Sequence, residues 1–283
     1  MVTGTLRRAF PTRWFGIFSQ LQGLERKWGP MHRIRFILCL LIASALPLLA
    51  DGGKRVELSE ESRAEIDQLT KRADSMMARK FYEDAILTYQ KILVLNPRDS
   101  VAHNKLGIAY HMLPDLRKAK VEYEQAKKLN PKYYEAWNNL GTIYYSLKNY
   151  KKAIKNYQKA LAISSDSATT YHNLGAAYFA VKKYDEGFQS FREAFRLDPT
   201  ILDKISSSGT IVRTAEVNQG VQNFYIAKLY AQSGQPEKAL SYLLKAIENG
   251  FDDYDKITKD PDFKTLVQDE RLARLIPSKP NSN

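Results

Sequence analysis

The chain has 283 residues and a formal net charge of +12, and its length suggests one or two domains. Its single cysteine, Cys39, lies in an apolar run, which excludes disulfides and a cysteine nucleophile from the folded part. The 17 Tyr and 14 Gly fit an all-α protein, and no stretch has the alternation of a sheet.

The first fifty residues have the anatomy of an export signal. Residues 31–50 combine a short basic head with an uncharged apolar run at 36–50 and small residues at its end. A bilayer span needs about 20 apolar residues, so this shorter run favours a cleaved signal over a permanent anchor, and a buried helix is disfavoured. We expect cleavage after Ala50 and export to the periplasm or another extracytoplasmic compartment. If the run is kept, the protein is membrane-tethered.

The signal anatomy is complete from Met31, so we hypothesise that translation starts there. Residues 1–35 carry seven Arg and Lys against Glu25 alone, which is half of the net charge. The alternative is that the basic and aromatic residues 1–30 form an amphipathic surface segment. A polar linker at 51–65 follows, in which Ser59 is a plausible helix cap.

Beyond the linker, one pattern returns every 34 residues. It places Leu-Gly and Tyr on one segment, and Ala, an aromatic residue and Ala on the next. The three clearest copies are Leu106, Gly107, Tyr110, Ala119, Tyr123 and Ala126; Leu140, Gly141, Tyr144, Ala153, Tyr157 and Ala160; and Leu174, Gly175, Tyr178, Gly187, Phe191 and Ala194. Spacings of three and four put each set on one helix face, so each copy predicts a helical hairpin.

The predicted hairpins divide the chain into units. Four are contiguous within 66–201, at 66–99, 100–133, 134–167 and 168–201. An insert at 202–219 follows, which we interpret as a loop with an extra helical turn; a flap over the neighbouring groove is the alternative. A fifth hairpin is expected at 220–253, and short capping helices with a polar tail at 254–283.

The 34-residue pattern resembles that of the tetratricopeptide repeat family, whose hairpins carry Trp, Leu-Gly, Tyr, Ala, Phe, Ala and Pro at these offsets. Arg72 and Ser165 depart from it. The resemblance implies an all-α right-handed superhelical solenoid of antiparallel helix pairs, with about five repeats and C-terminal capping helices. Small residues on both helices of a pair, such as Gly175 and Gly187, predict a close approach of the two backbones.

We find no constellation of residues that predicts catalysis. The histidines show neither a metal-binding spacing nor the zinc-protease pattern, and there is no phosphate-binding glycine loop and no Gly-x-Ser-x-Gly motif. The sequence therefore predicts no enzyme, no metal, no cofactor and no small-molecule substrate. The partners that we expect are other proteins.

The family resemblance implies that the first helix of each hairpin lines a concave groove. The partner-binding candidates at these offsets are Asn104, His111, Asn138, Asn139, Tyr145, His172, Asn173 and Phe179. Asn can both donate to and accept from a peptide backbone, and the two aromatic residues offer flat apolar surface, which would suit an extended peptide or a partner helix. The alternative is that Asn139 and Asn173 merely tie adjacent helices. The family's carboxylate clamp is not reproduced, because Thr70 and Asp74 stand where Lys and Asn are needed.

A basic stripe on one second helix is the other predicted surface. It consists of Lys148, Lys151, Lys152, Lys155 and Lys159. A solvated face is one interpretation. Binding of anionic lipid headgroups or envelope polymers, through the convex side, is the alternative function. No aromatic interleaving supports nucleic-acid binding. A non-catalytic subunit of an enzyme complex is a third possibility.

Overall fold

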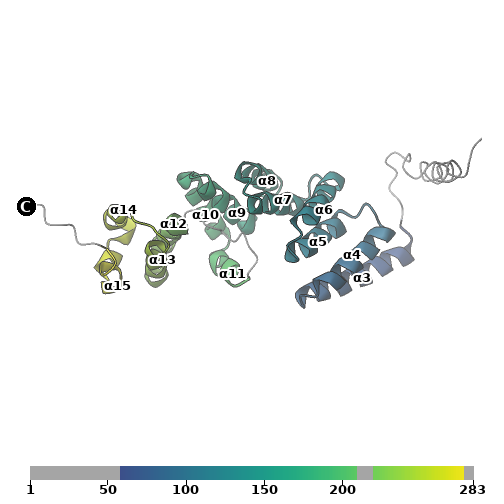
Figure 1. Ribbon diagram of the computed structural model, residues 1–283, viewed down its shortest axis with the longest axis horizontal. Helices are drawn as coiled ribbons and strands as arrows, with labels where there is room; N and C mark the ends of the chain where they lie inside the picture. Colours follow the sequence, from purple (N-terminus) through teal and green to yellow (C-terminus); the bar gives the residue numbers. More distant parts are fainter. Residues whose placement is uncertain (1–57, 209–218, 277–283) are drawn as a thin grey trace, which may run out of the picture. The chain divides into compact units, whose positions relative to one another are not determined.

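The computed structural model describes residues 58–208 and 219–276, which form helices and turns without a strand (Figure 1). Four helix pairs come first: α3 (Glu60–Ala78) with α4 (Tyr82–Leu95), α5 (Ser100–Met112) with α6 (Leu116–Leu129), α7 (Tyr134–Ser146) with α8 (Tyr150–Ile163), and α9 (Ala168–Ala180) with α10 (Tyr184–Leu197). Then follow α11 (Ile201–Ser208), the pair α12 (Gln219–Gln232) and α13 (Pro236–Glu248), and the short helices α14 (Tyr254–Lys259), η4 (Pro261–Phe263), η5 (Leu266–Gln268) and α15 (Glu270–Ala273).

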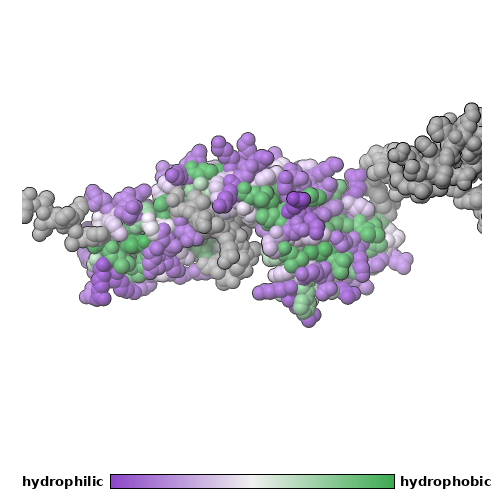
Figure 2. Space-filling view, in the orientation of Figure 1, coloured by the Kyte–Doolittle hydropathy of each residue, from purple (hydrophilic) through white to green (hydrophobic). Residues whose placement is uncertain are grey.

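This arrangement confirms the predicted all-α class and the solenoid of antiparallel helix pairs. The predicted signal at 36–50, the proposed start at Met31, Cys39, residues 209–218 of the insert and the tail from 277 lie outside the described residues. No helix of the described ranges is both long and apolar enough to cross a bilayer. In the view of Figure 2, hydrophilic residues occupy much of the visible surface, with apolar residues between them.

Each helix pair is delimited by local signals that can be read from the sequence. The side chains of Asp115, Asn149 and Ser167 accept hydrogen bonds from backbone N–H groups in the first turns of α6, α8 and α9. Pro97, Pro131 and Pro199 stand between units, where a residue that cannot continue a helix ends it. The helix boundaries therefore follow from short-range chemistry.

The turn inside a hairpin has a left-handed residue at its tip. Lys80, Lys148 and Lys182 have φ of 63°, 58° and 61°, and Gly234 has 71° at the equivalent position of the fifth unit. Glycine adopts this conformation without a Cβ clash, whereas another residue incurs a cost. Three of these turns thus have lysine at a position where glycine would adopt the positive φ at a lower cost.

The glycines of the central hairpins lie beneath an aromatic ring of the facing helix. A Cβ built on Gly107 would stand 2.6 Å from Cε1 of Tyr123, and one on Gly141 would stand 2.6 Å from Cε1 of Tyr157. Carbon atoms prefer separations of about 3.5–4.0 Å, so the missing side chain makes room for the ring. The expected approach of two backbones applies to the fourth hairpin, where a Cβ on Gly175 would lie 3.0 Å from the Gly187 carbonyl oxygen.

The residue at the family's tryptophan position ties its helix to the preceding turn. Trp137 Nε1–H donates to the Pro131 carbonyl at 2.9 Å. One unit earlier His103 takes this place, with Nε2 3.2 Å from the Pro97 carbonyl and Nδ1 2.6 Å from a Glu122 oxygen. Both ring nitrogens therefore face oxygens that accept hydrogen bonds, an arrangement that favours the imidazolium form.

Successive pairs pack through α4 on α5, α6 on α7 and α8 on α9. Equivalent contacts recur: Gln90 Nε2 donates to Tyr110 Oη (3.1 Å), and Gln158 Nε2 donates to Tyr178 Oη (2.9 Å). The fifth unit instead meets the fourth through rings, and Phe188 lies 5.3 Å from Tyr225 between centroids. The stack is therefore continued by aromatic packing across the insert.

The described part of the insert is the eight-residue helix α11, longer than the single turn that we predicted. Asp203 of α11 accepts hydrogen bonds from Tyr230 Oη at 3.3 Å and from Lys238 Nζ at 2.9 Å. Tyr230 is the equivalent of Tyr110 and Tyr178, which contact the preceding pair. These contacts join α11 to α12 and α13.

The C-terminal helices cover the end of the fifth unit. Phe263 is fully buried, and its ring lies 5.5 Å from that of Phe224. Lys228 forms ion pairs with Asp260 and Asp262. Although burial works against its charge, these carboxylates raise the pKa of Lys228.

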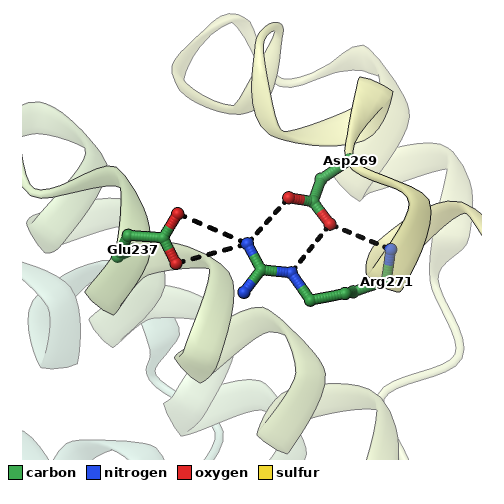
Figure 3. A network of polar contacts seen from close by, with 3 residues as sticks. All are labelled: Glu237, Asp269 and Arg271. Carbon is green, nitrogen blue, oxygen red and sulfur yellow. Dashed lines mark hydrogen bonds and ion pairs between the residues drawn. The ribbon is translucent and has the colours of Figure 1, made fainter.

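At the outer edge of this cap, Arg271 of α15 contacts two carboxylates: that of Asp269, directly before α15, and that of Glu237 in α13 (Figure 3). The closest distances from its guanidinium to the two carboxylates are 2.8 and 3.2 Å. All three groups lie near solvent, so this network contributes little to stability and mainly fixes the orientation of α15.

Candidate functional site

Five polar side chains from the second, third and fourth units form one chain of hydrogen bonds. Asn173 Nδ2 donates to Asn138 Oδ1 (3.1 Å), and Asn138 Nδ2 to Asn139 Oδ1 (3.2 Å). Asn139 Nδ2 donates to Asn104 Oδ1 (3.0 Å), and Asn104 Nδ2 to Tyr133 Oη (3.3 Å). These residues come from α9, α7 and α5, with Tyr133 directly before α7. We call them the asparagine chain.

The asparagine chain has hydrogen-bonding capacity to spare. A primary amide offers two N–H donors and an oxygen with two lone pairs, whereas each internal link uses one donor and one acceptor. Asn138 and Asn139 are half-buried, while Asn104 is only 3% exposed. The two asparagines of α7 are therefore the members best placed to meet a ligand.

The same bonds join neighbouring helices. Asn139 links α7 to α5, and Asn173 links α9 to α7. The interpretation that these residues tie adjacent helices thus describes the geometry correctly. Binding of a ligand by the remaining amide groups stays a prediction.

Five of the eight predicted groove residues are buried: Asn104, Tyr145, His172, Asn173 and Phe179. For the two rings, Tyr145 and Phe179, this corrects the expectation that they offer flat apolar surface. Phe179 is 1% exposed and contacts Phe191 and Tyr225, with centroid distances of 5.1 and 5.4 Å. Tyr145 is 5% exposed, packs edge-on against Tyr150, and has its pKa raised by burial. The physical reason is that each ring packs on other rings: Tyr145 on one of its own hairpin, and Phe179 on rings of its own hairpin and of the following unit.

His172 is buried inside the fourth hairpin. Its ring stacks on Phe191 at 5.0 Å, inside the fourth hairpin. Its Nδ1 has no hydrogen-bond partner among the described residues, and burial lowers the pKa of His172 to about 4. Burial also lowers the pKa of His111, which is half-buried on α5. Both rings are neutral at neutral pH.

A set of half-buried side chains remains available on the first helices, which we call the groove positions: Lys105, Ile108, His111, Asn138, Asn139 and Thr142. Thr142 Oγ1 accepts a hydrogen bond from the fully buried Tyr157 Oη at 3.2 Å, and donates to the Asn138 carbonyl at 3.2 Å. The groove positions thus mix amide, hydroxyl, imidazole, cationic and aliphatic groups.

Sequence reasoning missed two members of this region. Tyr133 ends the asparagine chain, but the family offsets assign no groove role to the last residue of a unit. Asp74 of α3 binds Lys105 Nζ (2.5 Å) and accepts from Tyr89 Oη (2.6 Å). The signal for this pair was a carboxylate at the offset where the clamp needs Asn, with a lysine 31 residues later.

The predicted basic stripe is exposed along α8 and the turn before it. Lys148, Lys151, Lys152, Lys155 and Lys159 are all exposed. Within the described residues, none of these five lysines forms an ion pair with a carboxylate. Tyr144 lies between Lys120 and Lys152, whose Nζ atoms are 5.5 and 5.4 Å from the ring centre. One tyrosine therefore does stand among these lysines.

The described residues contain no group of side chains that could form a metal centre. No three His, Cys, Asp or Glu side chains of residues 58–208 and 219–276 come close enough to hold an ion. The polar groups that do converge are amides and a phenol, which bind by hydrogen bonding. This chemistry suits recognition of a peptide.

Comparison with protein families assigns the repeats. Models of the tetratricopeptide repeat match residues 122–155, 168–201 and 224–249, and a related repeat model matches 141–182. These segments match the tetratricopeptide repeat. They include α7, α8, α9 and α10, which carry most of the asparagine chain and the basic stripe.

Comparison with solved structures finds the same fold in PilF. PilF of Pseudomonas aeruginosa is 18% identical, with a TM-score of 0.52 over 76% of this chain and 90% of that protein. MamA of Desulfovibrio magneticus RS-1 is 18% identical, with a TM-score of 0.48 over 68% of this chain and 96% of that one. No curated protein sequence matches the chain.

Proposed function

We propose that the protein is a non-catalytic interaction scaffold, and that the groove positions of the second and third repeats bind an extended segment of a partner protein. The observation that carries this proposal is the asparagine chain, which runs through three successive repeats. Tetratricopeptide repeats support a role in protein interaction, and the chain of amides gives that role a location.

The chemistry of the groove positions fits a peptide backbone. A peptide presents alternating N–H and C=O groups, and the free donors and acceptors of Asn138 and Asn139 complement them. Ile108 adds apolar contact, and Lys105 is already engaged by Asp74. The groove positions would therefore recognise the bound segment mainly through its main chain.

The buried rings support this role indirectly. Phe179 packs on Tyr225 of the following unit, and Tyr145 packs on Tyr150 within its own hairpin, so these rings help to fix the helices that carry Asn138, Asn139 and Asn173. A binding surface whose groups are held in place loses less conformational freedom when a ligand binds.

The apolar run at 36–50 extends the proposal to the location of the protein. It supports export from the cytoplasm, with the repeats facing the periplasm or another extracytoplasmic space. N-terminal sequencing of the mature protein tests this part. A mature start near residue 51 agrees with a cleaved signal, and a retained 36–50 segment means a membrane tether.

Crosslinking and capture from the native cell envelope test the binding face. The variant Asn138→Asp with Asn139→Asp replaces amide donors by acceptors and should lose the captured partner. Asn156→Asp, on the outer side of α8, is the control and should retain it. Equal recovery of the partner protein with both variants would rule out the groove positions as its binding site.

A further inference from the structure

The lysines of α8 lack the acidic partners that some cations of the neighbouring helices have. On α6, Lys118 pairs with Asp115 and Lys120 with Glu124, and on α10 Arg196 pairs with Glu193. The α8 sequence holds four lysines and no acidic residue. The outer face of α8 therefore carries positive charge with no acidic residue on the same helix to neutralise it.

An exposed leucine stands at the end of this positive surface. Leu147, between α7 and α8, is 52% exposed, whereas Leu113 and Val181 at the equivalent turns are half-buried. Leu147 N–H donates to the Ile143 carbonyl (3.0 Å), and Lys148 N–H donates to the Tyr145 carbonyl (2.8 Å). The backbone of the turn is thus fixed with an apolar side chain in solvent.

The residue after Leu147 adds a cation in a costly conformation. Lys148 has φ of 58°, where the fifth unit uses Gly234. Lys182 occupies the same position in the next hairpin and is also exposed. A left-handed lysine costs stability that glycine would not, and such outliers gather at functional surfaces.

The geometry points to a contact with a bilayer that contains anionic phospholipids. We propose that Leu147 enters the lipid interface while Lys148, Lys151 and Lys152 meet the phosphate groups. Lys155 and Lys159, one and two turns further along α8, add attraction at longer range. An apolar anchor surrounded by cations is the combination that peripheral membrane segments use.

Two other polyanions fit less well. Nucleic acid is bound through stacking on exposed rings, and Tyr144 is half-buried between two lysines. An acidic peptide would satisfy the lysines but gives no reason for a solvent-exposed leucine beside them. This contact is separate from the groove positions, so it holds or fails independently of the proposed partner binding.

The test places a polarity-sensitive probe on the full chain. In a Cys39→Ser background, the label is attached to Leu147→Cys, and the vesicles contain either phosphatidylcholine alone or equal parts of phosphatidylcholine and phosphatidylglycerol. We expect the label to enter the acyl region only with the anionic vesicles. The matched control is Leu87→Cys on α4, since Leu87 is 58% exposed but follows Glu83 and Asp84.

A neutralised variant measures the contribution of the lysines. Each lysine near an anionic surface contributes roughly five-fold, so Lys151→Gln, Lys152→Gln and Lys155→Gln together should lower the ratio of inserted to aqueous label about 100-fold at excess vesicles. The control replaces Lys71, Lys91 and Lys264, which are also exposed, and should change the ratio less than about three-fold.

Residues 1–57 are identical in every variant, so differences between the variants report on the described stack alone. A label at 147 that stays aqueous with anionic vesicles would overturn the proposal, as would equal insertion of the label at 87. Insertion that is unchanged after the α8 lysines are neutralised would overturn the role assigned to them. Soluble inorganic polyphosphate should leave the 147 label aqueous, because it provides charge without an apolar phase.

Discussion

Replacing Gly141 by alanine tests the packing of a glycine beneath an aromatic ring. The new Cβ would stand 2.6 and 2.7 Å from Cε1 and Cδ1 of Tyr157, whose side chain is fully buried. Overpacking of this kind costs about 1–3 kcal/mol, and the better helix propensity of alanine returns up to about 1 kcal/mol. We expect a net loss of about 1 kcal/mol in the free energy of unfolding.

We expect the overpacking cost to lie in the lower part of the range of about 1–3 kcal/mol. The reason is that the first unit already has an alanine, Ala73, at the equivalent position opposite Tyr89. There the tyrosine hydroxyl donates to Asp74, whereas Tyr157 donates to Thr142. A ring can therefore settle beside alanine when its hydroxyl has another partner.

Urea unfolding followed by far-UV circular dichroism measures the loss. Ala162→Gly, exposed on α8 of the same repeat, calibrates helix propensity and should cost about 1 kcal/mol. Combining Gly141→Ala with Tyr157→Leu reproduces the Ala227 and Leu243 pair of the fifth unit, and should show a favourable coupling of about 1 kcal/mol or more. If Gly141→Ala instead stabilises the protein by the propensity difference, the ring-contact reasoning is refuted.

Three further predictions concern the turns and the joints between repeats. Lys182→Gly should raise the free energy of unfolding by about 0.5–1 kcal/mol in urea titrations, because glycine adopts the φ of 61° without a Cβ clash, and a loss would contradict this. Burial lowers the pKa of His103, but its bonds to Glu122 and Pro97 outweigh burial and raise the pKa overall. Its stabilisation is therefore complete below the unfolded pKa of about 6.5 and is lost as pH rises through the higher folded pKa; unfolding at several pH values should show this loss in the wild type and not in His103→Gln. Asn139→Ala leaves the buried Asn104 Oδ1 without its donor and should cost about 1–3 kcal/mol by the same assay, against less than about 0.5 kcal/mol for Gln125→Ala at an exposed position of α6.

The sequence predicted the helix pairs well because their signals are local and repeated. A 34-residue period with apolar residues three and four apart fixes which face of each helix is buried. Asp, Asn and Ser caps with inter-unit prolines fix the ends. Tyr123, Tyr157 and Phe191 occur at one offset and are all buried in the structure.

The site was harder to predict because burial at a groove offset depends on the next unit. Phe179 is buried since Tyr225 of the fifth unit packs on it, and those two residues are separated by the insert. The bond from Asn104 to Tyr133 joins residues 29 apart, across two helices. The family's groove offsets take account of neither the following unit nor the last residue of the same unit, which explains why the predicted site missed Tyr133 and included buried rings.

Site-specific photo-crosslinking tests the central claim, that a partner segment lies along the groove positions, most directly. A photoreactive residue placed in turn at 108, 139 and 142 should attach the same partner protein, and one at 158 on the outer side of α8 should not. Attachment from 158 with none from the three groove positions would contradict the account.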